Sequence, residues 1–343
     1  MIINFRLRVI TVFFAAGILA SGCQRGVQRA EGEDMNVFAL RPDASRIIVK
    51  YLGDEDPRVQ VKAIEIAAVT KRADLCPRIY GLLISEYVPV RYVAAASLGD
   101  MGYSPAESRL REILLKDTDE NAKLGYSYAL YKLGDKSKFD AIKEALKSKD
   151  ETLRANAAVL LGKCGQKSEL DLLYWAMTDK NSTDKVSLQA AAAIAMLGDE
   201  KIYPRLWTLL ISVYADDRVL GVEAMGNLGT LEAKDSLKTM LDDAVLDVRI
   251  AAASALGRLG DTIGSELVAK VLSGEADASL PAEDLERVRI QAALAIGSIC
   301  SEQTKAYLAD LLTDNSKMVQ LAAAKSVFEC TATKPKLTGE VLK

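Results

Sequence analysis

Histidine is absent from all 343 residues of this sequence. Its absence excludes imidazole acid–base catalysis, nucleophiles that depend on histidine, and metal sites with histidine ligands. Carboxylate and thiol chemistry are the options that remain, and the sequence offers no catalytic constellation for either. We therefore predict a protein that is not an enzyme and holds neither a metal ion nor a cofactor.

The apolar run near the start is too short to span a membrane comfortably. It extends from Val9 to Gly22, 14 residues, whereas a transmembrane helix needs roughly 20. A basic start, a short apolar run and small residues before a cleavage site are typical of a secretory signal peptide. The closing residues, Leu19-Ala20-Ser21-Gly22-Cys23, resemble a bacterial lipobox.

The lipobox resemblance implies that residues 1–22 are removed and that Cys23 becomes an acylated N-terminus. It would carry a thioether-linked diacylglycerol and a further acyl chain such as palmitate, and two or more chains anchor a protein stably. Gln24 differs from the Asp that inner-membrane lipoproteins commonly carry at this place. In a diderm bacterium we therefore expect the anchored protein to lie at the outer membrane of the cell envelope and to face the periplasm. An uncleaved anchor or a chance cysteine is the alternative.

The chain has slightly fewer basic than acidic residues. Removal of the predicted signal peptide would take away Arg6 and Arg8 and leave 42 basic residues (44 less 2) against 47 acidic ones, a net charge of −5. This balance argues against nucleic acid and against a polybasic membrane contact.

A pattern close to V-R-x-x-A-A-x-A-L-G occurs nine times. Its copies are 31 to 33 residues apart except for one step of 40, and a period of this length fits one pair of helices per repeat. Apolar residues recur at helical spacing, and small residues stand three and eight places after the Arg position, where they let neighbouring helices approach closely. The Arg position is occupied by Gln60, Arg91, Lys123, Arg154, Ser187, Arg218, Arg249, Arg289 and Gln320.

The alignment resembles HEAT repeats of the phycobilisome-lyase type over roughly residues 44 to 330. The resemblance implies an all-α, right-handed α-solenoid of about nine two-helix repeats, whose second helices line the concave side. We expect a signal peptide at 1–22, an acylated tether at 23–42, the solenoid at 43–332 and a tail at 333–343. The repeats would stack into a curved rod on the order of 80 Å long.

Residues near the repeat turns are expected to be structural. In HEAT proteins an Asp six places before the Arg position joins a hydrogen-bonded ladder between successive turns, with cationic partners. The matching residues are Asp54, Asp117, Lys123, Asp243, Arg249 and Asp314. Cys300 and Cys330 stand in stacked repeats near 10 Å apart, so we expect them to be unpaired, because a disulfide needs Cα atoms within roughly 7 Å.

The third repeat departs most from the pattern. Tyr126 and Tyr131 occupy places that are otherwise small, apart from Phe328 in the last repeat, and Tyr128 lies opposite the apolar stripe. Of the 17 aromatic residues after Cys23, 13 lie between Tyr80 and Tyr214. Aromatic rings suit partner recognition, although rings that fill looser space between repeats are the alternative. The candidate partner-binding residues are Tyr126, Tyr128, Tyr131, Lys132, Asn156, Lys163, Gln189 and Glu223.

We therefore predict a lipid-anchored, extracytoplasmic scaffold that binds a protein or peptide along its concave face. One alternative is an enzyme or enzyme-accessory protein, because HEAT-like repeats occur in bilin lyases and hydroxylases; the absence of histidine weighs against the hydroxylase, whose iron site uses His-Glu pairs. The other alternative is a mechanical envelope component without a discrete ligand.

Overall fold

The structure, a computed structural model, describes residues 36–275 and 281–332. Within these ranges the chain forms helices and turns and no strand, which confirms the all-α prediction. The predicted signal peptide at 1–22, the acylation site at Cys23 and the tail at 333–343 lie outside the described residues. No described helix combines the length and the apolar character needed to cross a membrane.

Ordered structure begins earlier than the predicted tether allows. A 3₁₀ turn, η1 (Val37–Leu40), leads into α1 (Arg41–Tyr51), so the last residues of the range 23–42 are already helical. Pro42 lies in the first turn of α1, where its fixed φ and missing N–H suit a helix start.

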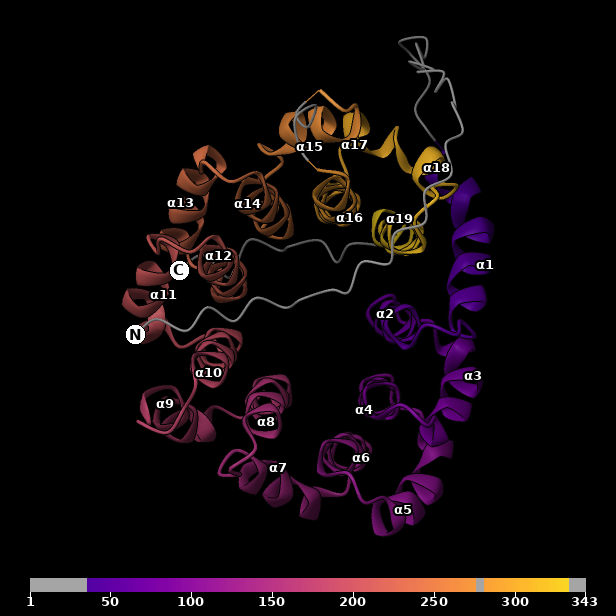
Figure 1. Ribbon diagram of the computed structural model, residues 1–343, viewed down its shortest axis with the longest axis vertical. Helices are drawn as coiled ribbons and strands as arrows, with labels where there is room; N and C mark the ends of the chain where they lie inside the picture. Colours follow the sequence, from indigo (N-terminus) through magenta and orange to yellow (C-terminus); the bar gives the residue numbers. More distant parts are fainter. Residues whose placement is uncertain (1–35, 276–280, 333–343) are drawn as a thin grey trace, which may run out of the picture. The chain divides into compact units, whose positions relative to one another are not determined.

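The helices form two concentric layers (Figure 1). The inner layer is α2 (Pro57–Val69), α4 (Val88–Asp100), α6 (Glu120–Lys132), α8 (Glu151–Cys164), α10 (Asp184–Met196), α12 (Ala215–Leu228), α14 (Leu246–Arg258), α16 (Ala282–Ile299) and α19 (Lys317–Cys330). The outer layer is α1, α3 (Cys76–Gly81), α5 (Glu107–Lys116), α7 (Phe139–Ala145), α9 (Leu170–Thr178), α11 (Tyr203–Leu210), α13 (Leu231–Thr239), α15 (Ser265–Leu272), α17 (Glu302–Lys305) and α18 (Leu308–Leu311).

Short 3₁₀ turns flank many outer helices. They are η2 (Ala73–Leu75), η3 (Leu82–Ile84), η4 (Ser104–Ala106), η5 (Lys136–Lys138), η6 (Lys167–Glu169), η7 (Glu200–Ile202) and η8 (Met240–Asp242). The step of 40 residues runs from Arg249 to Arg289. Its extra residues lie between α15 and α16, partly outside the described residues.

Side-chain caps start several inner helices. Asp56, Asp119 and Asp150 accept hydrogen bonds from the first free backbone N–H groups of α2, α6 and α8. Such a cap contributes about 1 kcal/mol to a helix. At the other end of α8, Gly165 adopts φ 73°, a left-handed conformation that glycine takes without steric cost. Local sequence therefore sets where these helices begin and end.

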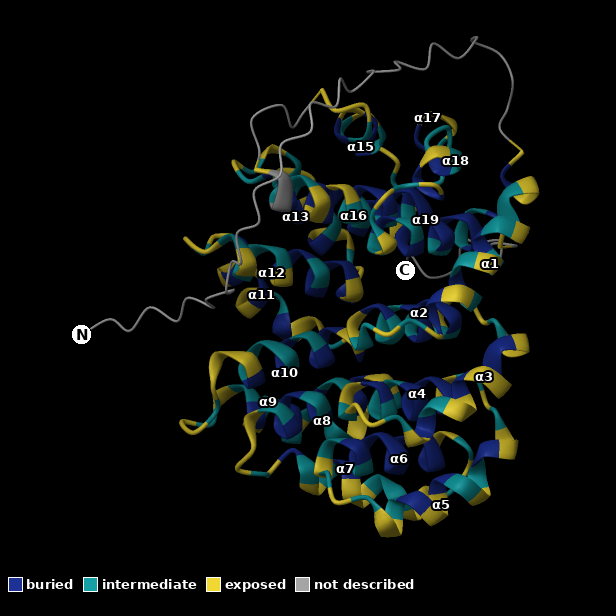
Figure 2. Cartoon of the chain, turned by 45° about the vertical axis from the view of Figure 1, so that its right-hand side comes forward, coloured by how far each residue is buried: buried dark blue, intermediate teal, exposed yellow. Residues whose placement is uncertain are grey.

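The apolar core lies between the two layers, as the buried residues in Figure 2 show. The small residues of the repeat pattern bring inner helices together as predicted. A Cβ atom on Gly99 of α4 would lie 2.7 Å from the Cα atom of Ala129 on α6, and one on Gly162 of α8 would lie 3.0 Å from that of Ala193 on α10. Glycine at these places is thus a packing requirement.

The array is curved as predicted, but it does not end as a rod, because its last repeat packs against its first. The last inner helix, α19, packs against both α1 and α2 of the first repeat, and Figure 1 shows the three helices together. One continuous apolar core includes Ile48 of the first repeat and Val319 and Val327 of the last. The first and last repeats therefore bury each other's apolar faces, which an open solenoid would leave to solvent.

Polar and aromatic contacts line this junction, which we call the seam. The Tyr51 hydroxyl donates to Oε1 of Gln320 at 2.7 Å. Two guanidinium groups lie over the Phe328 ring, with Arg41 Cζ 5.0 Å and Arg72 Cζ 4.8 Å from its centroid. Phe328 occupies a place that is small in most repeats, and its bulk fills the space where the first repeat meets the last.

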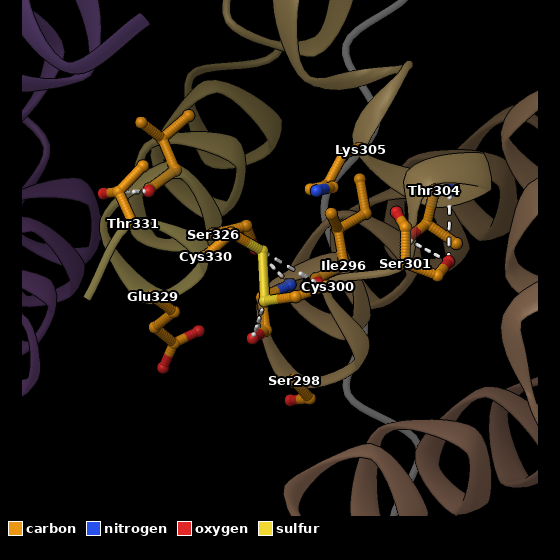
Figure 3. The surroundings of a disulfide bond; sticks show 12 residues. Ile296, Ser298, Cys300, Ser301, Thr304, Lys305, Ser326, Glu329, Cys330 and Thr331 are labelled. Carbon is orange, nitrogen blue, oxygen red and sulfur yellow. Dashed lines mark hydrogen bonds between the residues drawn. A yellow bond between two sulfur atoms is a disulfide. The ribbon is translucent and has the colours of Figure 1, made fainter. Parts of the chain in front are cut away.

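A disulfide joins Cys300 to Cys330 with a Cα–Cα distance of 5.4 Å (Figure 3), so the prediction that they are unpaired is wrong. Cys300 ends α16 in a left-handed conformation, φ 52°. This backbone turn carries the residue away from the regular stacking position and toward the last turn of α19. The bond therefore holds the end of α19 beside the seam residues Phe328 and Thr331.

Candidate functional site

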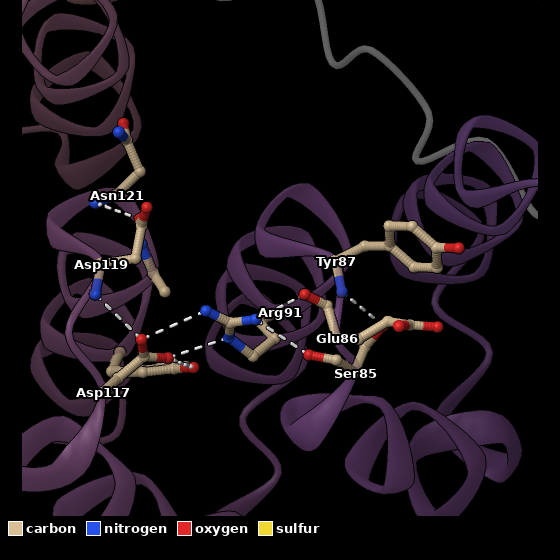
Figure 4. Close-up of polar contacts among 9 residues, drawn as sticks. Ser85, Glu86, Tyr87, Arg91, Asp117, Asp119 and Asn121 are labelled. Atoms are coloured by element: carbon tan, nitrogen blue, oxygen red, sulfur yellow. Dashed lines mark hydrogen bonds and ion pairs between the residues drawn. The ribbon is translucent and has the colours of Figure 1, made fainter.

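Arginines at the start of inner helices form the ladder between repeats. On α4, Arg91 donates to both carboxylate oxygens of Asp117 in the next repeat, at 2.9 and 3.1 Å (Figure 4). The same guanidinium donates to the carbonyl of Ser85 at 2.9 Å. Burial alone would raise the pKa of Asp117, but bonds from the Asp119 N–H, the Tyr126 hydroxyl and Arg91 lower it overall. The carboxylate is thus held ionised in a largely buried turn.

The same contact recurs along the array. An arginine in one repeat meets the aspartate of the next repeat in the pairs Arg91–Asp117, Arg154–Asp179, Arg218–Asp243 and Arg289–Asp314. Arg154 also donates to the carbonyls of Leu146 and Asn181, both at 3.2 Å. These residues join the turns of successive repeats, and their hydrogen-bonding groups have partners within the protein.

The ladder differs from the prediction in its cationic members. Lys123 pairs with Glu120 on its own helix, and Arg249 donates to the carbonyls of Asp243 and Ala244 instead of to a carboxylate. Each ladder aspartate faces the repeat before it. Its partner is therefore the cation of that earlier repeat and not the cation of its own repeat. Asp54 has no earlier repeat, and its partner is Lys317 across the seam.

The tyrosines of α6 are buried, so the prediction that they contact a partner is wrong. Tyr126 donates to Asp117 at 2.7 Å, and the Tyr131 ring stacks on Phe139 with centroids 5.0 Å apart. Tyr128 is buried and donates to Oδ1 of Asp100. Burial and then the nearby Asp100 charge raise the pKa of Tyr128, so its hydroxyl stays protonated. The rings fill space between repeats, which is the alternative given by the sequence.

An ion pair joins α4 and α8, the inner helices on either side of α6. Lys163 of α8 forms an ion pair with Asp100 of α4, and the two residues belong to repeats on either side of α6. A Cβ atom on Gly125 of α6 would lie 2.9 Å from the carbonyl oxygen of Tyr92 on α4, so glycine permits this close approach. The Tyr128 hydroxyl therefore donates to the same carboxylate that pairs with Lys163.

This arrangement leaves a hollow of about 540 Å³ on the inner face, which we call the inner hollow. Its apolar wall includes Val69, Val93, Val159 and Leu160, from α2, α4 and α8. Charged residues of both signs stand around it, namely Glu65, Lys71, Asp100 and Lys163. Tyr92 also lines it, and burial and then Asp100 raise the pKa of its phenol. An apolar wall with a few polar groups suits a small part of a ligand or partner.

The other predicted partner-binding residues are spread along the inner layer. Asn156 donates to Asn121 at 2.9 Å, and Glu223 pairs with Arg258 at 2.7 Å, each across two successive inner helices. Lys132 is exposed at the end of α6 and Gln189 is half-buried on α10. Of the predicted set, the structure brings only Lys163 into the inner hollow. The sequence signals that could have found this hollow are Gly99 and Gly125.

The described residues contain no group of three or more Cys, Asp or Glu side chains placed to hold a metal ion. The thiol of Cys164 is half-buried, and burial raises its pKa to about 12. A thiol with such a pKa is protonated at neutral pH and is a poor nucleophile.

The model of the PBS lyase HEAT-like repeat matches residues 248–274. This stretch of the chain therefore has the pattern of a HEAT-like repeat, and it lies within an array of helix pairs. No curated protein matches the sequence of this chain. Among solved structures, the chain is similar to the complex of CpcE and CpcF of phycocyanin lyase from Nostoc, with 23% identity and a TM-score of 0.43 over 76% of this chain and 90% of that one.

Two further structures show the same kind of likeness. Human deoxyhypusine hydroxylase in complex with glycerol has 20% identity and a TM-score of 0.36, covering 76% of this chain and 97% of its own. The Escherichia coli protein YibA has 17% identity and a TM-score of 0.37, covering 87% and 99%. Likeness at this level says nothing of what this chain does.

Proposed function

We propose that this protein is a noncatalytic scaffold that holds a segment of a partner protein in the inner hollow. The observation that carries the proposal is the hollow itself, an apolar recess bordered by Asp100, Lys163, Glu65 and Lys71. It fits an extended peptide that inserts one aliphatic side chain between Val93 and Val159 and places polar groups against the charged border. Apolar burial would provide affinity and the charges would fix orientation.

The proposed address is the outside of the cytoplasmic membrane, with the chain anchored by lipid at Cys23. The Cys300–Cys330 disulfide supports this address, because such bonds form and persist in oxidising compartments. Labelling cells with an alkynyl palmitate tests the anchor. The unaltered protein should take up the label and sediment with membranes, and Cys23→Ser should do neither. Equal labelling of both proteins would refute lipid attachment.

A photoreactive amino acid at Val69 tests the scaffold role. Val69 borders the inner hollow with 59% of its surface exposed, and Ile263, between α14 and α15, is matched at 60%. We expect crosslinking in cells to capture one defined protein from position 69 and not from position 263. Equal capture at both positions would contradict the proposal, as would a chromophore or metal that copurifies in stoichiometric amount.

A further inference from the structure

The only two tryptophans of the chain occupy equivalent places in successive repeats. Trp175 on α9 and Trp207 on α11 are 32 residues apart, one repeat length. Each is a large apolar residue with about two-fifths of its surface in solvent, 41% and 40%. Each lies three residues from the C-terminal end of its outer helix, near the turn that leads to an inner helix. Both tryptophans therefore lie near the same end of successive outer helices.

The turn after α11 adds three exposed apolar side chains at this end of α11. Ile211, Val213 and Tyr214 are 65%, 87% and 69% exposed. Together with Trp175 and Trp207 they form what we call the edge surface. Single exposed apolar residues are ordinary, but a cluster of large ones marks an interaction site.

The turn is held in one conformation by polar bonds. Arg218 donates to the carbonyl of Ser212 at 2.8 Å, and the Ser212 hydroxyl donates to Asp217 at 2.8 Å. The same hydroxyl accepts from the backbone N–H of Tyr214 at 3.2 Å. The apolar side chains therefore project from a fixed frame, which lowers the entropy cost of binding.

A hollow of about 360 Å³ adjoins the turn, and its lining is acidic. It includes the carboxylates of Asp184 and Asp217, the phenol of Tyr214 and the side chain of Arg205. Among the described residues neither carboxylate forms an ion pair, although Asp217 accepts from Ser212. Two carboxylates therefore line the hollow against the one guanidinium of Arg205.

We propose that the edge surface is a second docking site, for a protein segment in which lysine or arginine alternates with apolar residues. A cationic side chain would enter the acidic hollow beside the Tyr214 ring, and apolar neighbours would cover Trp207 and Ile211. The site shares no residue with the inner hollow, so it would let the scaffold hold two partners at once. The acidic groups disfavour an anionic membrane as the occupant.

Intrinsic fluorescence tests this proposal, because both tryptophans of the full chain belong to the edge surface. The probe is a synthetic peptide of alternating leucine and lysine, and the control peptide has glutamate in place of lysine. We expect saturable binding of the lysine peptide with a blue shift of the tryptophan emission, weakened by salt. The glutamate peptide should leave the emission unchanged.

Charge-neutral variants separate a specific site from general attraction. D184N combined with D217N should weaken lysine-peptide binding about tenfold or more, while the exposed Asp310→Asn in the last repeat should leave binding unchanged. Asparagine keeps an oxygen that can accept from Ser212, and circular dichroism would establish that the variant folds. Equal binding of both peptides, equal affinity of both variants, or a blue shift with anionic phospholipid vesicles would overturn the proposal.

Discussion

The ammonium group of Lys317 lies 2.8 Å from a carboxylate oxygen of Asp54, and the two residues belong to the last and first repeats. In four other repeats an aspartate near the turn pairs with an arginine of the repeat before it. The seam therefore continues the ladder around the array, with Lys317 in the role that arginine has elsewhere. Burial would raise the pKa of Asp54, but the hydrogen bond from Lys317 lowers it overall.

Phe328 should contribute strongly to stability because it is buried at the seam. Phe328→Ala should lower the free energy of unfolding by about 3 kcal/mol or more, since truncation of a buried phenylalanine loses apolar contact and leaves a cavity. Phe38 is the matched control because it is 62% exposed, and Phe38→Ala should cost about 0.5 kcal/mol or less. Chemical denaturation measures both values. Similar small losses for the two variants would contradict burial at the seam.

Tyr128 should act on stability through its buried hydroxyl. Tyr128→Phe leaves Asp100 without one hydrogen bond and should cost about 1 to 2 kcal/mol of unfolding free energy. Tyr80→Phe, on the partly exposed face of α3, should be near neutral. A Tyr128→Phe protein as stable as the unaltered one, again measured by denaturation, would refute the buried contact.

The disulfide should stabilise the end of α19. Replacing both Cys300 and Cys330 by serine should cost about 3 to 4 kcal/mol, because the bond closes a loop with a sequence separation of 30. Hydrogen exchange should show the largest loss of protection in α16, α19 and α1, the elements nearest the bond and the seam. Uniform loss along the chain would mean that the bond does not act on the seam in particular.

The ladder should make stability sensitive to acid. The folded-state pKa values of Asp117 and Asp243 are lowered from 3.8, so these carboxylates bind protons more readily in the unfolded chain. Their contribution is complete above the unfolded pKa and is lost as the pH falls through the lower folded values. Asp117→Asn should therefore destabilise the protein at neutral pH and flatten its loss of stability below about pH 4. An unchanged pH profile in denaturation experiments would contradict the ladder.

Periodicity predicted the repeats well, because apolar and small residues at fixed places are a local signal. It could not predict the seam, whose contact between Tyr51 and Gln320 spans 269 residues of sequence. Two features of the sequence pointed to the seam. Phe328 stands where most repeats have a small residue, and Asp54 is a ladder aspartate with no earlier repeat to pair with. The role of Tyr128 was predicted wrongly because its position within one helix could not show that its hydroxyl lies beside Asp100 of α4, which pairs with Lys163 of α8. The disulfide was missed because Cys300 leaves the regular helical stack.

Closure of the array is tested most directly by a zero-length carbodiimide crosslink between Asp54 and Lys317. The purified monomer would be treated, digested and analysed by mass spectrometry, with the Asp100–Lys163 pair as an internal control for the chemistry. The closed structure predicts a peptide that joins the first repeat to the last within one chain. Recovery of the control crosslink without the seam crosslink would show that the array is open and would contradict the account.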